Sequence, residues 1–137
     1  MQAVTRPADP SDLNFILNSF LKSLRAYPAF EHIPNDIYYV EQKLVLESYI
    51  MTSRPIILCN SEDPDQIFGY IIGVPNVCTN FVYVKYPYRK FGFAKRLLLT
   101  LHTNDLSSPI RASYTCRNWG VLSKKFNHVY SPYRGQI

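Results

Sequence analysis

The sequence predicts a mixed α/β fold in which a mostly antiparallel sheet is flanked by helices. Three observations predict it. Residues 13–24 carry the apolar stripe of an amphipathic helix. Short runs rich in β-branched and aromatic residues, at 55–59, 67–74 and 81–84, are typical of buried strands. Residues 80–101 combine a strand, a basic turn and a further amphipathic helix.

Length and composition predict one globular domain spanning residues 1–137. A content of 47% hydrophobic and 18% charged residues is ordinary for a folded protein and excludes a disordered chain. The net charge of +5 would suit a polyanion-binding protein. The clearest basic cluster, however, lies at 89–96, where a single phosphorylated cofactor would account for it. We therefore do not expect nucleic acid as a partner.

The cysteines and the N-terminal residues indicate the compartment. Cys59, Cys78 and Cys116 are odd in number and widely spaced, which favours buried reduced thiols over disulfides or a metal site. Residues 1–10 lack the apolar core of a signal peptide, and no apolar run approaches the length of a membrane span. We expect a cytoplasmic protein that binds neither metal nor membrane.

The chain begins with a short strand and a helix. Residues 3–5 favour a strand that ends near Pro7. Asp9 is a good helix cap and Pro10 suits the first helical position. The apolar stripe that follows, up to Leu24, predicts the first helix.

A second helix is predicted after the proline-containing loop at 26–34. Its cap is expected at Asn35 or Asp36 and its end near Thr52. We expect its stripe at the positions with roughly helical spacing, which are Ile37, Val40, Leu44, Glu47 and Met51.

The next three strands are expected to form an antiparallel meander. Residues 60–65 have the composition of a turn between the strands at 55–59 and 67–74. Pro75 and Asn76 then lead to the strand at 81–84.

The last part of the chain predicts three short elements after the helix at 94–101. They are a strand at 110–114, a short helix at 118–126 and a strand at 128–130. The predicted order is β-α-α-β-β-β-α-β-α-β.

The basic turn, residues 88–94, has the composition of an anion site. The first N–H groups of a helix have no intrahelical acceptor, and the helix dipole adds about half a positive charge there. Gly92 and Ala94 keep side-chain bulk away from this backbone. Positive charge comes from the side chains of Arg89, Lys90, Lys95 and Arg96.

The pattern Arg89-x-x-Gly92-x-Ala94, five residues after Val84, resembles a known cofactor signature. That signature is Q/R-x-x-G-x-G/A, which binds acetyl-CoA in the GNAT acyltransferase superfamily. The predicted order of elements also resembles the GNAT fold over nearly the whole chain. Fuller members add a seventh strand, and compact members without one occur in bacteriophage genomes, so we expect a compact, phage-type member.

The resemblance implies a CoA-dependent N-acyltransferase that moves an acetyl group from acetyl-CoA to an amine of a small molecule or a protein. Backbone groups of Val82, Tyr83 and Val84 would pair with the pantetheine arm, and an N–H near Val84 would polarise the thioester carbonyl. The pyrophosphate would be held by the residues of the turn and the helix start, Arg89, Lys90, Phe91, Gly92, Phe93, Ala94 and Lys95.

The sequence departs from the family at the residues that move protons. Many members have a Glu early in the fourth strand, where this chain has no carboxylate at 77–80. Glu31, His32 and Asp36, in the loop that joins the first two helices on the acceptor side, are the candidates to replace that carboxylate. Asp36 also suits a helix cap, and Glu31 and His32 also suit an exposed loop. Ser123 stands where the family has a Tyr on the fourth helix, and Tyr114 is a substitute for that Tyr that would equally suit a core.

These departures leave a second function open. A GNAT-fold protein with little or no catalysis could keep the cofactor pocket and bind a protein or nucleic-acid partner. The intact turn at 88–94 favours the enzyme, because a pure scaffold does not need it.

Overall fold

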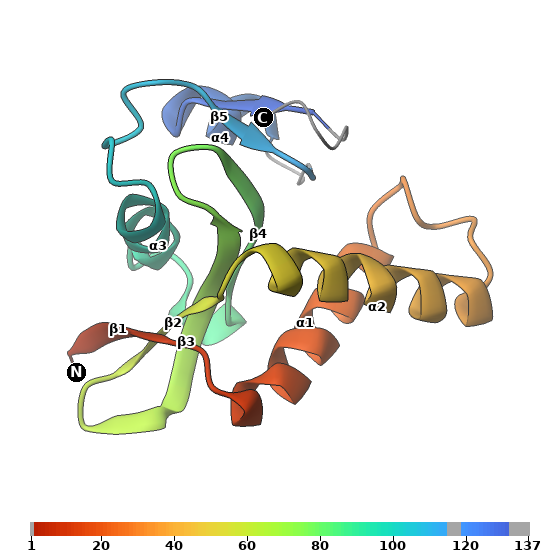
Figure 1. The fold of residues 1–137 in the computed structure, drawn as a ribbon, viewed down its shortest axis with the longest axis horizontal. Coiled ribbons are helices and arrows are strands. Elements are labelled where there is room, and N and C mark those ends of the chain that lie inside the picture. Colours follow the sequence, from red (N-terminus) through yellow and green to blue (C-terminus); the bar gives the residue numbers. More distant parts are fainter. Residues whose placement is uncertain (1, 115–118, 132–137) are drawn as a thin grey trace.

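The computed structural model describes residues 2–114 and 119–131, and these form one six-stranded sheet with helices packed on it (Figure 1). The strands are β1 (Ala3–Pro7), β2 (Ile56–Asn60), β3 (Asp63–Val74), β4 (Cys78–Val84), β5 (Ile110–Ala112) and β6 (His128–Tyr130). The α-helices are α1 (Leu13–Arg25), α2 (Asn35–Thr52), α3 (Phe93–Leu101) and α4 (Trp119–Lys125). Short 3-10 turns at Pro10–Asp12 and Tyr86–Tyr88 precede α1 and α3.

The strands lie in the sheet in their sequence order, β1-β2-β3-β4-β5-β6. The pairs from β1 to β4 are antiparallel, as the predicted meander requires. Strand β5 is parallel to β4, and β6 is parallel to β5, because helices connect them. The predicted mixed, mostly antiparallel sheet and the order of its elements are confirmed.

The two faces of the sheet carry separate hydrophobic cores. Helices α1 and α2 lie on one face, and α3 lies on the other (Figure 1). The first core packs α1 and α2 on the sheet through buried side chains that include Ile16, Phe20, Tyr38, Leu46, Tyr70 and Phe81. The second core packs α3 through Leu58, Phe68, Ile71, Val84, Leu97 and Leu98. Among the described residues, no helix is both long and apolar enough to span a membrane.

The stripe predicted for α2 is wrong. Its apolar members lie on the exposed face, and the buried face carries Tyr38 and Leu46, with Val45, Tyr49 and Ile50 partly buried. Apolar residues occur around most of this helix, so their spacing did not single out one face. The core instead takes Tyr38, because its hydroxyl finds an acceptor when buried: it donates to the Leu21 carbonyl at 2.6 Å.

The predicted cap of α2 is also wrong. Pro34 is the N-cap, and the helix begins at Asn35. The side chain of Asn35 is engaged elsewhere, since its Oδ1 accepts a hydrogen bond from Arg25 Nη2 at 2.7 Å. A tertiary contact with α1 has therefore replaced the local capping contact that the sequence suggests.

Several strands are longer or shorter than expected. Strand β1 continues to Pro7 because every residue from Ala3 onward pairs with β2, and its edge position tolerates a proline. Strand β3 begins at Asp63, so the turn predicted at 60–65 is confined to residues 61–62. Strand β4 begins at Cys78 rather than at 81. Strand β5 ends at Ala112 rather than at 114.

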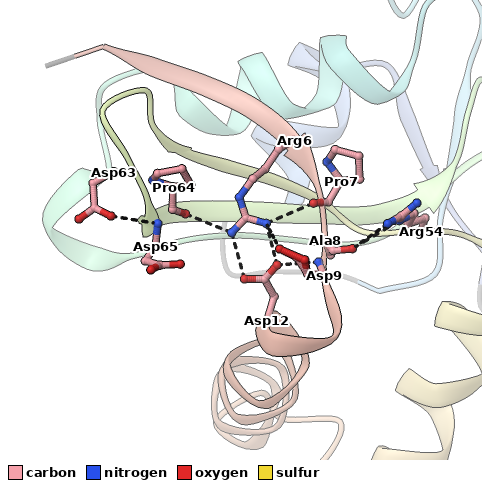
Figure 2. A network of polar contacts seen from close by, with 9 residues as sticks. All are labelled: Arg6, Pro7, Ala8, Asp9, Asp12, Arg54, Asp63, Pro64 and Asp65. Atoms are coloured by element: carbon pink, nitrogen blue, oxygen red, sulfur yellow. Dashed lines mark hydrogen bonds and ion pairs between the residues drawn. The ribbon is translucent and has the colours of Figure 1, made fainter.

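An ion pair fixes the connection from β1 to α1 (Figure 2). The Arg6 guanidinium donates to both carboxylate oxygens of Asp12, at 2.7 and 3.0 Å, and to the carbonyl of Pro64 at 3.1 Å. Asp12 also accepts the backbone N–H of Asp9 at 2.8 Å. The hydrogen bond from Arg6 holds the pKa of the Asp12 carboxyl below its usual range. This network joins β1, the start of α1 and the start of β3.

Candidate active site

Strands β4 and β5 separate after a short contact. They pair only at Cys78 with Arg111 and at Thr79 with Ala112. Strand β4 continues to Val84, and among the described residues no strand pairs with the second half of this edge, a space that we call the gap. The Val82 N–H points into this gap, where it donates to the Tyr114 hydroxyl at 3.3 Å. The gap thus holds a backbone donor that is bonded to a side chain instead of a strand.

An apolar cavity of about 90 Å³ adjoins this gap. That volume is comparable to about three water molecules. It is lined by Thr79 and Val82 of β4, Ala94 and Leu98 of α3, Ala112 and Tyr114 at the end of β5, and Leu122, Phe126 and His128 around α4 and β6. The cavity therefore extends from the first turn of α3 to the separation of β4 and β5. Three residues predicted for the site, Val82, Ala94 and Tyr114, meet in it.

The start of α3 has the geometry of an anion site. Gly92 is the N-cap with φ of 76°, a left-handed conformation that glycine adopts without strain. A Cβ at Gly92 would meet no heavy atom within 4 Å, so the space outside this turn is open. The first intrahelical bond runs from the Arg96 N–H to the Gly92 carbonyl at 3.0 Å. The N–H groups at 93–95 consequently have no intrahelical acceptor and can hold an anion.

Positive charge surrounds this turn, but Arg89 is committed to the protein. Its Nε donates to the Val84 carbonyl at 2.9 Å, and its guanidinium lies over the rings of Tyr83 and Tyr86. Arg89 thereby ties the turn to the end of β4. Lys90 and Lys95 are exposed beside the helix start, which leaves them free to face an anion.

The other predicted cofactor residues divide between packing and exposure. Phe93 stacks on Phe68 with ring centroids 5.4 Å apart, which fixes the first turn of α3 on β3. Phe91 is 66% exposed. Val84 is buried in the second core, and Tyr83 packs against the first core. Of the three predicted β4 residues, only Val82 lines the cavity.

Ser123 is not brought to the cavity. Its hydroxyl donates to the Gly120 carbonyl within α4 at 3.4 Å. Leu122 and Phe126 are the α4-side residues that face the cavity. The catalytic roles of Ser123 and Tyr114 both stay predictions, and of the two residues only Tyr114 lines the cavity.

Glu31 and His32 lie in the turns between α1 and α2, and neither lines the cavity. Their side chains are 55% and 92% exposed, and His32 Nε2 lies 3.3 Å from Glu31 Oε1. Figure 1 places this loop on the α1 and α2 side of the molecule. Their predicted position on the acceptor side stays a prediction.

The sequence reasoning missed a buried polar chain beside the cavity. His102 Nε2 lies 2.8 Å from Thr79 Oγ1, which lies 2.9 Å from His128 Nε2. Burial lowers the pKa of His102 to about 4, and burial also lowers the pKa of His128, so both rings are neutral at pH 7. A histidine within a short strand was the available signal, but the two hydrogen bonds join Thr79 to residues 23 and 49 positions further along the sequence.

Within the described residues, no group of three or more His, Cys, Asp and Glu side chains could hold a metal ion. Cys59 and Cys78 are buried free thiols. Cys116 lies outside the described residues.

Comparison with known proteins identifies the fold. No family model and no curated protein matches the sequence. Among solved structures, a predicted acetyltransferase from Clostridium acetobutylicum, solved with acetyl-CoA, has a TM-score of 0.62 at 15% identity, covering 91% of this chain and 88% of that one. AAC(6')-Iy, in complex with the bisubstrate analogue CoA-S-monomethyl-acetylneamine, has a TM-score of 0.55 at 12% identity, covering 94% and 92%.

A third similar structure carries the family name. A GCN5-related N-acetyltransferase from Rhodopseudomonas palustris has a TM-score of 0.52 at 13% identity, covering 74% of this chain and 64% of that one. The initials of that family name form the word GNAT. The three structures share the arrangement of sheet and helices described above, and this chain therefore has the GNAT fold.

Proposed function

We propose that the protein is a cytoplasmic CoA-dependent N-acyltransferase that moves an acetyl group from acetyl-CoA to an amine. One observation carries the proposal: a single cavity is lined both by Ala94, in the first turn of α3 beside the anion site, and by Val82 and Tyr114 at the separation of β4 and β5. A long thioester with a phosphorylated end needs both features, one for its charge and one for its carbonyl. The similar proteins solved with acetyl-CoA or a CoA conjugate support CoA binding by a protein of this fold.

The residues at the start of α3 fit the pyrophosphate of CoA. The backbone N–H groups at 93–95 and the helix dipole would face it, and Lys90 and Lys95 would add charge. Gly92 suits this role because the space beyond its missing Cβ is open. Arg89 would act indirectly, by holding the turn against Val84.

The Val82 N–H and the Tyr114 hydroxyl would serve the chemistry. A thioester carbonyl in the gap would take the Val82 N–H as its hydrogen-bond donor in place of Tyr114, whose hydroxyl accepts it at 3.3 Å. Once released, the Tyr114 hydroxyl would be close enough to give its proton to the departing sulfur. That task is modest, because a thiol pKa of about 8.5 lets the thiolate leave near neutral pH.

The acceptor amine is the group that needs a base. An alkyl ammonium has a pKa of about 10.4, so at neutral pH most of it carries a proton that blocks attack. The cavity lining offers Thr79, Tyr114 and His128 as its polar side chains, and none of them is a carboxylate. We infer slow transfer whose rate rises with pH towards the pKa of the amine.

The test is turnover with acetyl-CoA and a panel of amines, including small polyamines, an aminoglycoside and a lysine peptide, measured as release of free thiol. Thiol release that depends on an amine and rises with pH would support the proposal. Firm acetyl-CoA binding with no turnover on any amine would favour a binding module with the same fold. Neither binding nor turnover would contradict the proposal.

A further inference from the structure

Three side chains from distant parts of the chain meet beside the cavity. His102 caps the C-terminal end of α3, Thr79 lies on β4, and His128 begins β6. They are 0%, 2% and 9% exposed. Thr79 and His128 also line the cavity. Buried polar groups of this kind are costly unless every one is satisfied, so the direction of each hydrogen bond matters.

The direction of every bond follows from one backbone donor. The Asn76 N–H donates to His102 Nδ1 at 3.0 Å, so the proton of this neutral ring is on Nε2, which donates to Thr79 Oγ1 at 2.8 Å. The Thr79 hydroxyl can then donate to His128 Nε2 at 2.9 Å. That leaves the His128 proton on Nδ1, which donates to the Phe126 carbonyl at 2.7 Å. All the bonds run one way and both rings are satisfied while neutral.

This hydrogen-bond chain adds a side-chain link between two parts of the molecule that share few strand pairs. We name β5, α4 and β6 the wall, because their residues Ala112, Leu122, Phe126 and His128 close one side of the cavity. The wall lies together at one end of the molecule, beyond β4 (Figure 1). Its strand pairing to β4 is limited to two residue pairs, at Cys78 and Thr79. The bond from Thr79 to His128 is an additional link between β4 and the wall.

An added proton on either histidine disrupts the one-way series of hydrogen bonds from Asn76 to Phe126. On His128 it would occupy Nε2, so the Thr79 hydroxyl would lose its acceptor and its hydrogen would have to turn away. On His102 it would occupy Nδ1 and point at the Asn76 N–H. No carboxylate among the described residues hydrogen-bonds to either ring, so nothing compensates the new charge. The titratable groups around the rings are each other, with centroids 6.0 Å apart, Tyr114 across the cavity, and Arg111 on the adjacent strand.

We propose that the chain His102–Thr79–His128 positions the wall against β4, and that acid releases the wall by protonating one of the two rings. Thr79 and the two histidines are positioning residues of the cavity. The inference rests on the proposed function only in taking this cavity as the acetyl-CoA site. Its consequence is that acetyl-CoA binding depends on pH through the wall.

The experiment measures how strongly the wall is held against β4, and how tightly the protein binds acetyl-CoA, as the pH changes. The Arg111 N–H donates to the Val77 carbonyl and the Ser113 N–H to the Thr79 carbonyl, both across the boundary between β4 and the wall. Hydrogen-exchange protection factors of these two amides report the boundary directly, and calorimetry reports the Kd of acetyl-CoA. Between about pH 7.5 and 3.5, a range that includes the pKa of His102 at about 4, we expect protection to fall at least tenfold and the Kd to rise at least tenfold.

Matched variants distinguish the positioning of the wall by these hydrogen bonds from a general loss of protein stability. Thr79→Val removes the hydroxyl at nearly constant volume and should give low protection at both pH values, whereas Thr79→Ser should respond to pH as the unmodified protein does. In His128→Gln the amide oxygen can still accept from Thr79 but cannot be protonated in this range. Because His102 can still take a proton in that variant, the double variant His102→Gln/His128→Gln is the decisive one. Its protection should stay high at low pH, and this result does not depend on whether Thr79→Val folds.

The outcomes are distinct. Protection that is independent of pH in the unmodified protein, or a pH response that persists in His102→Gln/His128→Gln, would overturn the inference. Protection that falls with acid while the Kd of acetyl-CoA stays constant would overturn the link between the wall and the cavity. If the expected exchange behaviour appears but acetyl-CoA does not bind at any pH, the positioning role stands and the proposed function fails.

Discussion

The Tyr114 hydroxyl occupies the one backbone donor that the proposed reaction needs. Val82 N–H donates to it at 3.3 Å, which is a long hydrogen bond and therefore a weak one. An incoming carbonyl can replace such a partner at little cost. Tyr114 therefore occupies the gap in the free protein and would lie beside the thioester when acetyl-CoA fills the gap.

Tyr114→Phe tests this arrangement. We expect kcat to fall by about tenfold, which is below the usual range for general acid catalysis because a thiolate needs little help to leave. The affinity for acetyl-CoA should be unchanged or higher, since the Val82 N–H no longer has a competing acceptor. Steady-state kinetics and calorimetry measure the two quantities. A lower affinity with unchanged kcat would contradict the assigned role.

Ser123→Ala is the matched comparison for that variant. Ser123 donates to Gly120 within α4 and does not line the cavity. We expect a loss of less than tenfold in kcat, because a serine is a poor acid and would at most position a water. A thousandfold loss would show that Ser123 has a direct role in the reaction.

The pKa of His102 predicts how stability depends on pH. Burial lowers it from 6.5 to about 4, so the folded state binds this proton more weakly than the unfolded state does. The stabilisation is fully present above about pH 6.5 and is lost as the pH falls towards 4. Urea midpoints at several pH values should show this decline, and His102→Gln should reduce it. His32→Gln, at an exposed site, is the control and should leave the decline unchanged.

Single residues also show why sequence reasoning found only part of the site. The turn motif at 89–94 is local, so spacing alone located Gly92 and Ala94. The chain of His102, Thr79 and His128 depends on which strands are neighbours, and no local pattern contains that information. Arg89 belongs to the motif, but its bond to Val84 could not be predicted because side-chain direction depends on the fold.

At the scale of elements, the entry to α1 depends on one ion pair. Asp12 is nearly buried and accepts from both Arg6 and the Asp9 backbone. Arg6→Met should lower the free energy of unfolding by about 3 kcal/mol, because it leaves this carboxylate buried without its partner. Arg6→Lys keeps the charge without the two-pronged contact and should cost less. A loss below about 1 kcal/mol for Arg6→Met in urea unfolding would place the pair among ordinary surface ion pairs.

The start of α3 gives a prediction for binding. Gly92→Glu places bulk and negative charge in the open space where the pyrophosphate is proposed to lie, so acetyl-CoA should no longer raise the melting temperature. Gly92→Asn is the control, because asparagine also tolerates a positive φ and carries no charge. It should fold like the unmodified protein and keep part of the shift. Equal shifts in all three proteins would place the ligand elsewhere.

Helix α2 shows the limit of prediction at this scale. Its length was predictable to within a residue, because the proline-rich loop before it and the proline after it are strong local signals. Its buried face was not, since apolar side chains such as Val40 and Leu44 lie on the exposed side while Tyr38 enters the core. The choice depends on the hydrogen bond from Tyr38 to α1, which is a tertiary contact.

For the whole molecule, the order of elements was sufficient to predict the fold. Strong periodicity in α1, β-branched runs in the meander and the motif before α3 each fix one local segment, and short connections leave few ways to assemble them. What could not be predicted was where β5 stops. The end of β5 creates the gap beside Val82, which is the central feature of the proposed site. The ends of strands and helices are the parts that a sequence predicts least well.

At the scale of the whole molecule, the net charge of +5 would serve either a phosphorylated cofactor or a polyanion. The most direct measurement is calorimetric titration of the unmodified protein with acetyl-CoA, followed by thermal unfolding at a hundredfold excess over the Kd. We predict one binding site and a stabilisation of about 2.7 kcal/mol, seen as a rise of several degrees in Tm. No binding heat and no rise in Tm would contradict the proposal that this cavity and the start of α3 form an acetyl-CoA site.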